Sequence, residues 1–255
     1  MKIKHGDFSK LAENYSKFRP TYSKEVLMSI IGILNKSDIN FADIGAGTGI
    51  WTRMLSKNRN VKIVNAVEPD DNMRSFGENH LDNNDIVWSK GTGESTGLED
   101  NKYNLVTMAS SFHWVNFDKA MAEFYRILKP GGLFVALWNP RHIDDNSILV
   151  DIENKILDIN PDIKRVSSGK SEFVENLAKN FLSLDGFENL TFIEGRHQSK
   201  QNKDEYIGAW ESVNDIQHQL GEKFIDFMGY IDHKIKSEQI IKTTYLTRAW
   251  LVRKI

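Results

Sequence analysis

The sequence lacks cysteine entirely, which excludes disulfide bonds, thiolate metal sites and cysteine nucleophiles. It also lacks a long hydrophobic run, because the most continuous apolar segment, residues 133–138, is far too short to span a bilayer. The opening residues, MKIKHGDFSK, are polar and have no apolar stretch typical of a signal peptide. We therefore expect a soluble, cytoplasmic protein that does not enter the membrane.

An excess of charge of either sign is missing too, since 33 Lys and Arg residues nearly balance 35 Asp and Glu residues. The basic residues are scattered without interleaved aromatic residues, so no nucleic-acid partner is expected. The histidines show no H-x-x-x-H pair, which disfavours a metal-dependent enzyme, and no metal is expected. A chain of 255 residues is nevertheless long enough to bury a large core.

Short runs rich in Val, Ile and Phe alternate with amphipathic stretches in the first half of the chain. This alternation is typical of an α/β protein with a largely parallel sheet. The predicted strands cover residues 40–44, 61–67, 86–89, 105–109 and 133–138. The predicted helices cover residues 50–57, 72–79 and 118–128, and the sequence KPGG at 129–132 ends the last of them.

After residue 138 the alternation weakens, and residues 148–159 and 171–184 have helical patterns. Further predicted elements are a strand at 190–195, helices at 206–213 and 224–235, and a closing strand at 244–255. We therefore divide the chain into a Rossmann-like core with an N-terminal segment (1–139), a helical insertion (140–189), and remaining strands with cap helices (190–255). The expected fold is a Rossmann-like, mostly parallel sheet of seven strands, with helices on both faces, a terminal antiparallel hairpin and a helical cap.

The decapeptide ADIGAGTGIW, residues 42–51, joins a predicted strand to a predicted helix. Its glycines, Gly45, Gly47 and Gly49, allow a tight turn and leave backbone N–H groups open to a ligand at the start of the helix. The dinucleotide fingerprint G-x-G-x-x-G would need glycine at position 50, where Ile50 stands, and no Gly-Lys-Ser/Thr of a P-loop follows. Asp43 beside the loop also favours a ligand with a positive group over a pyrophosphate.

Glu68 follows the second predicted strand, in the sequence NAVEPDDNM. An acidic side chain at this position of an α/β fold can accept hydrogen bonds from both hydroxyls of a ribose. Together with Asp43 and the G-x-G-x-G loop, this arrangement resembles class I S-adenosylmethionine-dependent methyltransferases. The resemblance covers residues 8–140 well and includes KGTGEST (90–96), YNLVTMASSFHWV (103–115) and EFYRILKPGGLFVALW (123–138). The segments at 8–27 and 110–132 resemble the small-molecule branch that includes trans-aconitate methyltransferase-like proteins.

The resemblance implies S-adenosylmethionine as cofactor, with the three glycines against its methionine part and Asp43 near its ammonium group. It assigns the ribose to Glu68 and places Asp70 or Met73 beside the adenine. It also implies that Arg19 pairs with the methionine carboxylate and, with Tyr15, closes over the site. The other implied cofactor contacts are Thr92, Gly93 and Glu94 at the adenine edge, and Ala109 with Ser110 beside the sulfonium.

Methyl transfer from a sulfonium depends mainly on alignment of the reacting atoms, so a general base is optional. His113 is the candidate catalytic residue, because it follows the fourth predicted strand where the acceptor should enter; the alternative is that His113 only packs the loop. We predict a methyltransferase that acts on a small organic acceptor, as a monomer or a homodimer. The alternatives are a non-catalytic S-adenosylmethionine-binding protein and an NAD(P)-linked oxidoreductase, which Ile50 disfavours.

Overall fold

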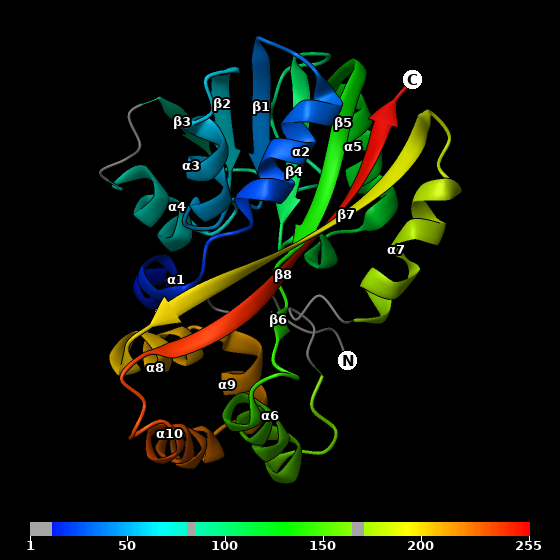
Figure 1. The fold of residues 1–255 in the computed structure, drawn as a ribbon. Helices are drawn as coiled ribbons and strands as arrows, with labels where there is room; N and C mark the ends of the chain where they lie inside the picture. The colour runs from blue at the N-terminus through cyan, green and yellow to red at the C-terminus, as the bar shows by residue number, and fades with distance from the viewer. Residues whose placement is uncertain (1–11, 81–84, 165–170) are drawn as a thin grey trace.

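A mixed eight-stranded sheet runs through the part of the chain that the structure describes, residues 12–80, 85–164 and 171–255 of a computed structural model (Figure 1). The strands follow the order β3-β2-β1-β4-β5-β8-β6, and β7 pairs with β8. Their bounds are β1 Ile39–Ile44, β2 Val61–Val67, β3 Ile86–Ser89, β4 Tyr103–Ala109, β5 Leu128–Trp138, β6 Arg141–His142, β7 Phe187–Gln201 and β8 Ile241–Lys254.

Helices connect these strands and also form a separate layer beyond one end of the sheet (Figure 1). In chain order they are α1 Ala12–Phe18, α2 Lys24–Leu34, α3 Ile50–Ser56, α4 Asp71–Glu78, the 3₁₀ helix η1 Phe112–Trp114, α5 Phe117–Ile127, α6 Ser147–Ile159, α7 Glu172–Leu182, α8 Lys203–Glu211, α9 Asn214–Leu220 and α10 Lys223–Lys234. Several begin at a side-chain cap, such as Ser23 for α2 and Asn202 for α8.

The parallel strands end together at one edge of the sheet. In β1 and β2 the partners at the carboxyl ends are Ile44 and Val67, and Val67 also pairs with Ser89 of β3. On the other side of β1, Asp43 pairs with Thr107 of β4. The loops after β1, β2, β3 and β4 therefore meet at this edge, and ligands of such sheets bind beyond it.

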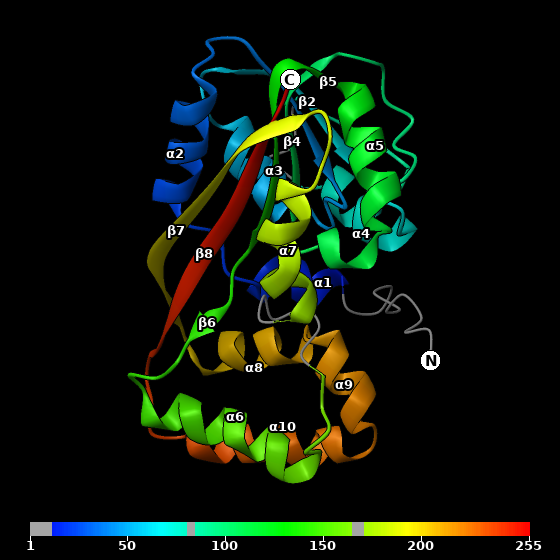
Figure 2. The ribbon, with the colours of Figure 1, turned by 90° about the vertical axis from the view of Figure 1, so that its right-hand side faces the viewer.

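Hydrophobic packing covers both faces of the sheet. Helices α2 and α3 pack on one face, where Ile30 and Trp51 join Phe41 of β1. Helices α5 and α7 pack on the other face. There Phe124 and Phe181 form a cluster with strand residues whose side chains point to that face, away from the side of Phe41. In Figure 2, α2 lies on one side of the sheet and α5 with α7 on the other.

The helices α6, α8, α9 and α10 bury a cluster of their own, which we call the cap. Trp210 and Phe227 lie at its centre, with ring centroids 5.3 Å apart. The long antiparallel strands β7 and β8 extend from the sheet to this cap, and α1 lies between the two parts (Figures 1 and 2). Helix α1 packs closely on α8, and Gly208 leaves the space for the Phe18 ring. A Cβ at position 208 would lie only 2.4 Å from that ring.

The structure confirms the Rossmann-like α/β prediction but corrects its strand number from seven to eight. The additional element is β6, two residues that pair with Tyr245 and Thr244 of β8 and are too short to give a sequence pattern. The expected terminal antiparallel pair is present as β7 and β8, with three helices between them along the chain. The predicted insertion, 140–189, does not pack as one unit. Its helix α6 packs in the cap, whereas its helix α7 packs on the sheet.

Replacement of Phe181 by Ala should destabilise the whole Rossmann-like core, because this α7 side chain stacks on Phe112 with centroids 6.1 Å apart. We expect a loss of about 3–5 kcal/mol in the free energy of unfolding, measured by urea denaturation. The neighbouring Leu182 is 74% exposed, so Leu182→Ala should change stability by no more than about 0.5 kcal/mol. Equal effects of the two changes would show that α7 is not part of the core.

Candidate functional site

The loop between β1 and α3 takes a backbone course that depends on its three glycines. Gly45, Gly47 and Gly49 have φ angles of 65°, 58° and 81°, in the left-handed region that favours glycine. A Cβ on Gly45 would lie 2.8 Å from the Ser111 hydroxyl, and one on Gly49 would lie 2.8 Å from the Arg53 guanidinium. A Cβ on Gly47 would meet nothing within 4 Å, so this glycine faces open space where a ligand can approach.

Glu68 joins this loop to the one that follows β2. Its Oε2 accepts a hydrogen bond from the Gly47 N–H at 2.7 Å, and its Oε1 accepts one from the Asp70 N–H at 2.9 Å. The side chain is buried, and that burial raises the pKa of the carboxyl group. Each carboxylate oxygen can still accept a second hydrogen bond, which is what two adjacent ribose hydroxyls would need.

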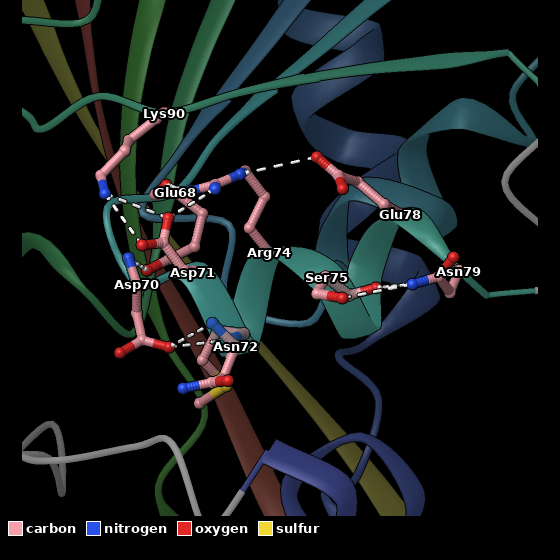
Figure 3. Close-up of polar contacts among 10 residues, drawn as sticks. Glu68, Asp70, Asp71, Asn72, Arg74, Ser75, Glu78, Asn79 and Lys90 are labelled. Atoms are coloured by element: carbon pink, nitrogen blue, oxygen red, sulfur yellow. Dashed lines mark hydrogen bonds and ion pairs between the residues drawn. The ribbon is translucent and has the colours of Figure 1, made fainter.

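The start of α4 fixes the backbone around Glu68, as Figure 3 shows. Asp70 is the N-cap of this helix, and its carboxylate accepts hydrogen bonds from the N–H groups of Asn72 and Met73. Arg74 donates to the carbonyl oxygen of Glu68 at 3.1 Å and pairs with Asp71, which Lys90 also contacts (Figure 3). The Asp70 carboxylate is therefore used in capping, and Met73 is buried beneath the helix.

Asp43 points into the interior of the sheet instead of toward the open side of the loop. It is fully buried, and its two carboxylate oxygens accept hydrogen bonds from Thr52 at 2.6 Å and Thr107 at 2.8 Å. Burial raises the pKa of Asp43 to about 7, although both threonine hydrogen bonds act in the opposite direction. Asp43 thus ties β1 to α3 and β4, and its predicted approach to an ammonium group stays a prediction.

The exit of β4 reaches the same edge of the sheet. Ser110 has a φ of 56°, unusual for a residue with a side chain, and its hydroxyl lies 3.0 Å from that of Tyr22. Ser111 donates to the Ile44 carbonyl at 3.2 Å, directly before the glycine loop. Ser111 therefore lies beside Gly45, and the contact of Ala109 and Ser110 with a sulfonium stays a prediction.

The loop after β3 contributes the predicted adenine-edge residues. Thr92 forms a short antiparallel bridge with Ser95, and a Cβ on Gly93 would lie 2.7 Å from Val115. Glu94 accepts a hydrogen bond at 2.7 Å from the N–H of Asn116, the N-cap of α5. The loop is thereby held against the exit of β4, on the same edge as Gly47 and Glu68.

Tyr15 and Arg19 lie at the junction between the sheet and the cap. The Arg19 guanidinium stacks over the Tyr15 ring at 4.9 Å, and it donates to the Ser212 carbonyl of the cap at 3.0 Å. Its buried Nε has no hydrogen-bond partner in the described ranges. A cofactor carboxylate remains a suitable partner for that N–H group.

His113 lies in η1, just after β4, with Trp114 and Trp138 beside its ring at centroid distances of 4.6 and 6.2 Å. Its Nδ1 accepts a hydrogen bond from the Trp138 indole at 3.3 Å. Burial lowers the pKa of His113 to about 4, although Asp215 of the cap acts to raise it. The imidazole is therefore neutral at physiological pH.

Comparison with known proteins adds independent support for this arrangement. Residues 42–136, which contain the glycine loop, Glu68 and the exit of β4, match the family described as methyltransferase domain. These residues form a methyltransferase domain. The resemblance to class I S-adenosylmethionine-dependent methyltransferases is thereby confirmed, whereas the trans-aconitate methyltransferase-like branch stays a prediction.

Curated relatives match part of the chain. An uncharacterized methyltransferase of Mycobacterium tuberculosis is 35% identical over 127 residues, which are 50% of this chain and 49% of that protein. The chain thus spans about half the length of the first curated relatives it matches. The ubiquinone/menaquinone biosynthesis C-methyltransferase UbiE of Campylobacter jejuni is 23% identical over 202 residues, covering 70% of this chain and 85% of that protein.

Solved structures match the methyltransferase domain and much of the cap. A protein of Anaeromyxobacter dehalogenans assigned as a type II methyltransferase superposes with a TM-score of 0.67 at 19% identity, covering 92% of this chain and 98% of its own. A protein of Methanococcus maripaludis assigned as S-adenosyl-L-methionine-dependent gives a TM-score of 0.54 at 24% identity, covering 74% and 90%. These likenesses establish the fold.

The structure also shows contacts that the sequence analysis missed, among them the Tyr22 hydroxyl on Ser110 and the Trp138 indole on His113. No local pattern predicts them, because each joins residues far apart along the chain. Across the described ranges, no group of three or more His, Asp or Glu side chains could hold a metal ion. Among the helices described, none is both long and apolar enough to cross a membrane.

The buried Asp43 of the methyltransferase domain predicts a pH dependence of stability. Because burial raises its pKa from the usual value to about 7, the folded protein holds a proton that the unfolded chain releases above about pH 4. The contribution of Asp43 to stability should therefore fall as the pH rises from about 4 to about 7. Asp43→Asn cannot ionise and should remove this slope.

Urea denaturation at a series of pH values measures the effect. The matched control is Asp38→Asn, at an exposed position, and it should keep the slope of the unmodified protein. A slope that persists unchanged in Asp43→Asn would contradict the raised pKa of the folded state.

Proposed function

We propose that this protein transfers a methyl group from S-adenosylmethionine to a small organic acceptor. The observation that carries the proposal is the contact between Gly47 and Glu68, where the loops after β1 and β2 meet. This contact leaves one face of Gly47 open and presents two carboxylate oxygens beside it. A bare backbone next to a ribose-binding carboxylate suits an adenosyl ligand with a bulky amino-acid part.

The residues around the loop fit S-adenosylmethionine in shape and chemistry. Glu68 has capacity to accept from both ribose hydroxyls, and the open face of Gly47 admits the methionine part without a Cβ clash. The Nε–H of Arg19, buried and without a partner in the described residues, suits the methionine carboxylate. Following the resemblance, the proposal assigns the adenine edge to Thr92, Gly93 and Glu94, and the sulfonium to Ala109 and Ser110.

The protein's contribution to such a reaction is alignment. When bound, the cofactor supplies an electrophilic methyl group on sulfur, and transfer breaks the carbon–sulfur bond as an acceptor lone pair forms the new bond. Holding two reactants in line can lower the barrier by about 7–11 kcal/mol. We assign that alignment to the paired strand ends on one side and to the cap on the other.

Two alternatives differ from this proposal in what they bind or catalyse. An NAD(P)-linked oxidoreductase is disfavoured, because Ile50 stands where a dinucleotide loop has its third glycine. A non-catalytic S-adenosylmethionine-binding protein would share the loop and Glu68 but would release no S-adenosylhomocysteine with any acceptor. The relationship to a quinone-pathway C-methyltransferase favours catalysis.

Glu68→Gln should weaken binding of S-adenosylhomocysteine, measured by calorimetric titration. The change removes the charge and places an amide N–H₂ against one of the two backbone N–H groups that Glu68 now accepts from. A hydrogen bond to a charged group contributes about 1.5–3 kcal/mol, so the dissociation constant should rise about 10- to 100-fold. Gly47→Ala should weaken binding as well, because its Cβ would occupy the open face.

The matched control is Glu78→Gln, at an acidic residue that ends α4 and forms an ion pair with Arg74 (Figure 3). It should bind S-adenosylhomocysteine as the unmodified protein does. Absence of any binding of S-adenosylmethionine and S-adenosylhomocysteine by the unmodified protein would overturn the proposed function.

A further inference from the structure

The hydrogen bond between Trp138 and His113 determines which imidazole nitrogen carries the proton. The indole Nε1 of Trp138 is a donor only, and it lies 3.3 Å from Nδ1 of His113. Nδ1 must therefore offer its lone pair, because two N–H groups cannot form a hydrogen bond with each other. In a neutral imidazole the single proton is then on Nε2.

The Nε2–H group of His113 is a buried donor without a hydrogen-bond partner among the described residues. The rings of Trp114 and Trp138 flank the imidazole and provide no acceptor at that position. Buried polar groups in native proteins are nearly always paired, so an unpaired one indicates a missing ligand atom or water. What is missing here is an acceptor, since an N–H group can only donate.

His113 is also in the right place for contact with a methyl acceptor. It lies three residues after Ser110, which the proposed function places beside the cofactor sulfur. Asp215 of α9, in the cap, is near enough to act electrostatically on both His113 and Arg141. Arg141 itself stacks on Trp210 at 3.9 Å and pairs with Glu153 at 2.7 Å, so its charge is already balanced. His113, whose Nε2–H group is unpaired, therefore lies between the end of β4 and the cap.

We infer that the methyl acceptor is a carboxylate, which has no proton to lose on methylation and presents an oxygen lone pair to the Nε2–H of His113, and that Trp138 is the positioning residue that sets this tautomer. The inference rests on the proposed function for the location of the reacting methyl group. It assigns His113 to hydrogen-bond donation and removes it from the role of general base, because its only lone pair is occupied by Trp138. It also excludes a protonated amine, which has no lone pair to accept the hydrogen bond.

The tautomer can be tested without an acceptor. In protein labelled with ¹⁵N at its seven histidines, long-range ¹H–¹⁵N correlation spectra distinguish the two neutral tautomers, and the His113 signals are those missing in His113→Gln. We expect the Nε2–H form alone in the unmodified protein and a mixture of both forms in Trp138→Phe. A proton on Nδ1 in the unmodified protein would overturn the inference, whether or not Trp138→Phe folds.

The acceptor class is tested on the same signals in protein saturated with S-adenosylhomocysteine. The probes are benzoate and succinate, compared with benzylamine and putrescine as amines of similar skeleton. At least one of the acids should shift the Nε2–H resonance of His113, and neither amine should. A resonance that no acid moves up to its solubility limit, or that an amine moves, would overturn the assignment.

Once an oxygen acceptor that the protein methylates has been found, variants of His113 distinguish hydrogen-bond donation from proton abstraction. Glutamine places an amide N–H₂ near the position of Nε2 but cannot act as a base, so His113→Gln should retain activity to within about tenfold, whereas His113→Phe should lose about 100-fold in kcat/KM. The control His218→Phe, at an exposed histidine of α9, should leave activity unchanged. Equal losses in the Gln and Phe variants would indicate a base and contradict the inference.

Failure of the proposed function would look different from failure of this inference. Without cofactor binding, calorimetric titration with S-adenosylhomocysteine would be blank, and the His113 tautomer would still be measurable. With cofactor binding intact, an Nδ1–H tautomer or methylation confined to amines would overturn the inference alone.

Discussion

The hydrogen bond from the Gly47 N–H to the Glu68 carboxylate is the contact on which the site depends. It forms only because β1 and β2 are parallel and in register at their ends, with Ile44 opposite Val67, and because glycine can adopt the positive φ of the loop. The Glu68 carboxylate also accepts a hydrogen bond from the N–H of Asp70, the N-cap of α4, so Glu68 also aligns the start of that helix. Strand register, loop conformation and helix start are thus fixed together.

Much of the Rossmann-like half could be predicted from the sequence, because each of its strands and helices carries a local signal. The apolar run of β1 ends at the glycine loop, and α5 has a clear hydrophobic face that ends before KPGG. Helix α2 was missed although it has such signals, namely a Ser23 cap and the left-handed Asn35 at its end. The sequence pattern of α7 predicts a helix but does not show whether that helix packs on the sheet or in the cap. Long-range packing decides this, and α7 packs on the sheet.

The candidate site likewise has a part that the sequence predicts and a part that only the folded structure shows. Residues within one loop, such as the glycines and Glu68, are predictable because their spacing along the chain sets their geometry. Asp43 shows where spacing is insufficient, because its side chain bonds to Thr52 and Thr107 inside the sheet, and only the fold shows which way it points. The pairs Tyr22–Ser110 and Trp138–His113 join segments that come together only in the folded protein. Tertiary contacts of this kind decide tautomer and orientation, which no sequence motif encodes.

Under the proposed function, the sheet edge is assigned to recognition of the cofactor and the cap to recognition of the acceptor. The cofactor edge is built from strand ends, whose positions are set by backbone pairing and vary little with side chains. The cap has its own buried cluster, so its inward residues can change without disturbing the sheet. Helix α1 packs on the cap, because Phe18 contacts Gly208, and Arg19, which follows α1, donates to the Ser212 carbonyl. His113 follows β4 on the sheet side, and the further inference assigns its remaining N–H group to the acceptor.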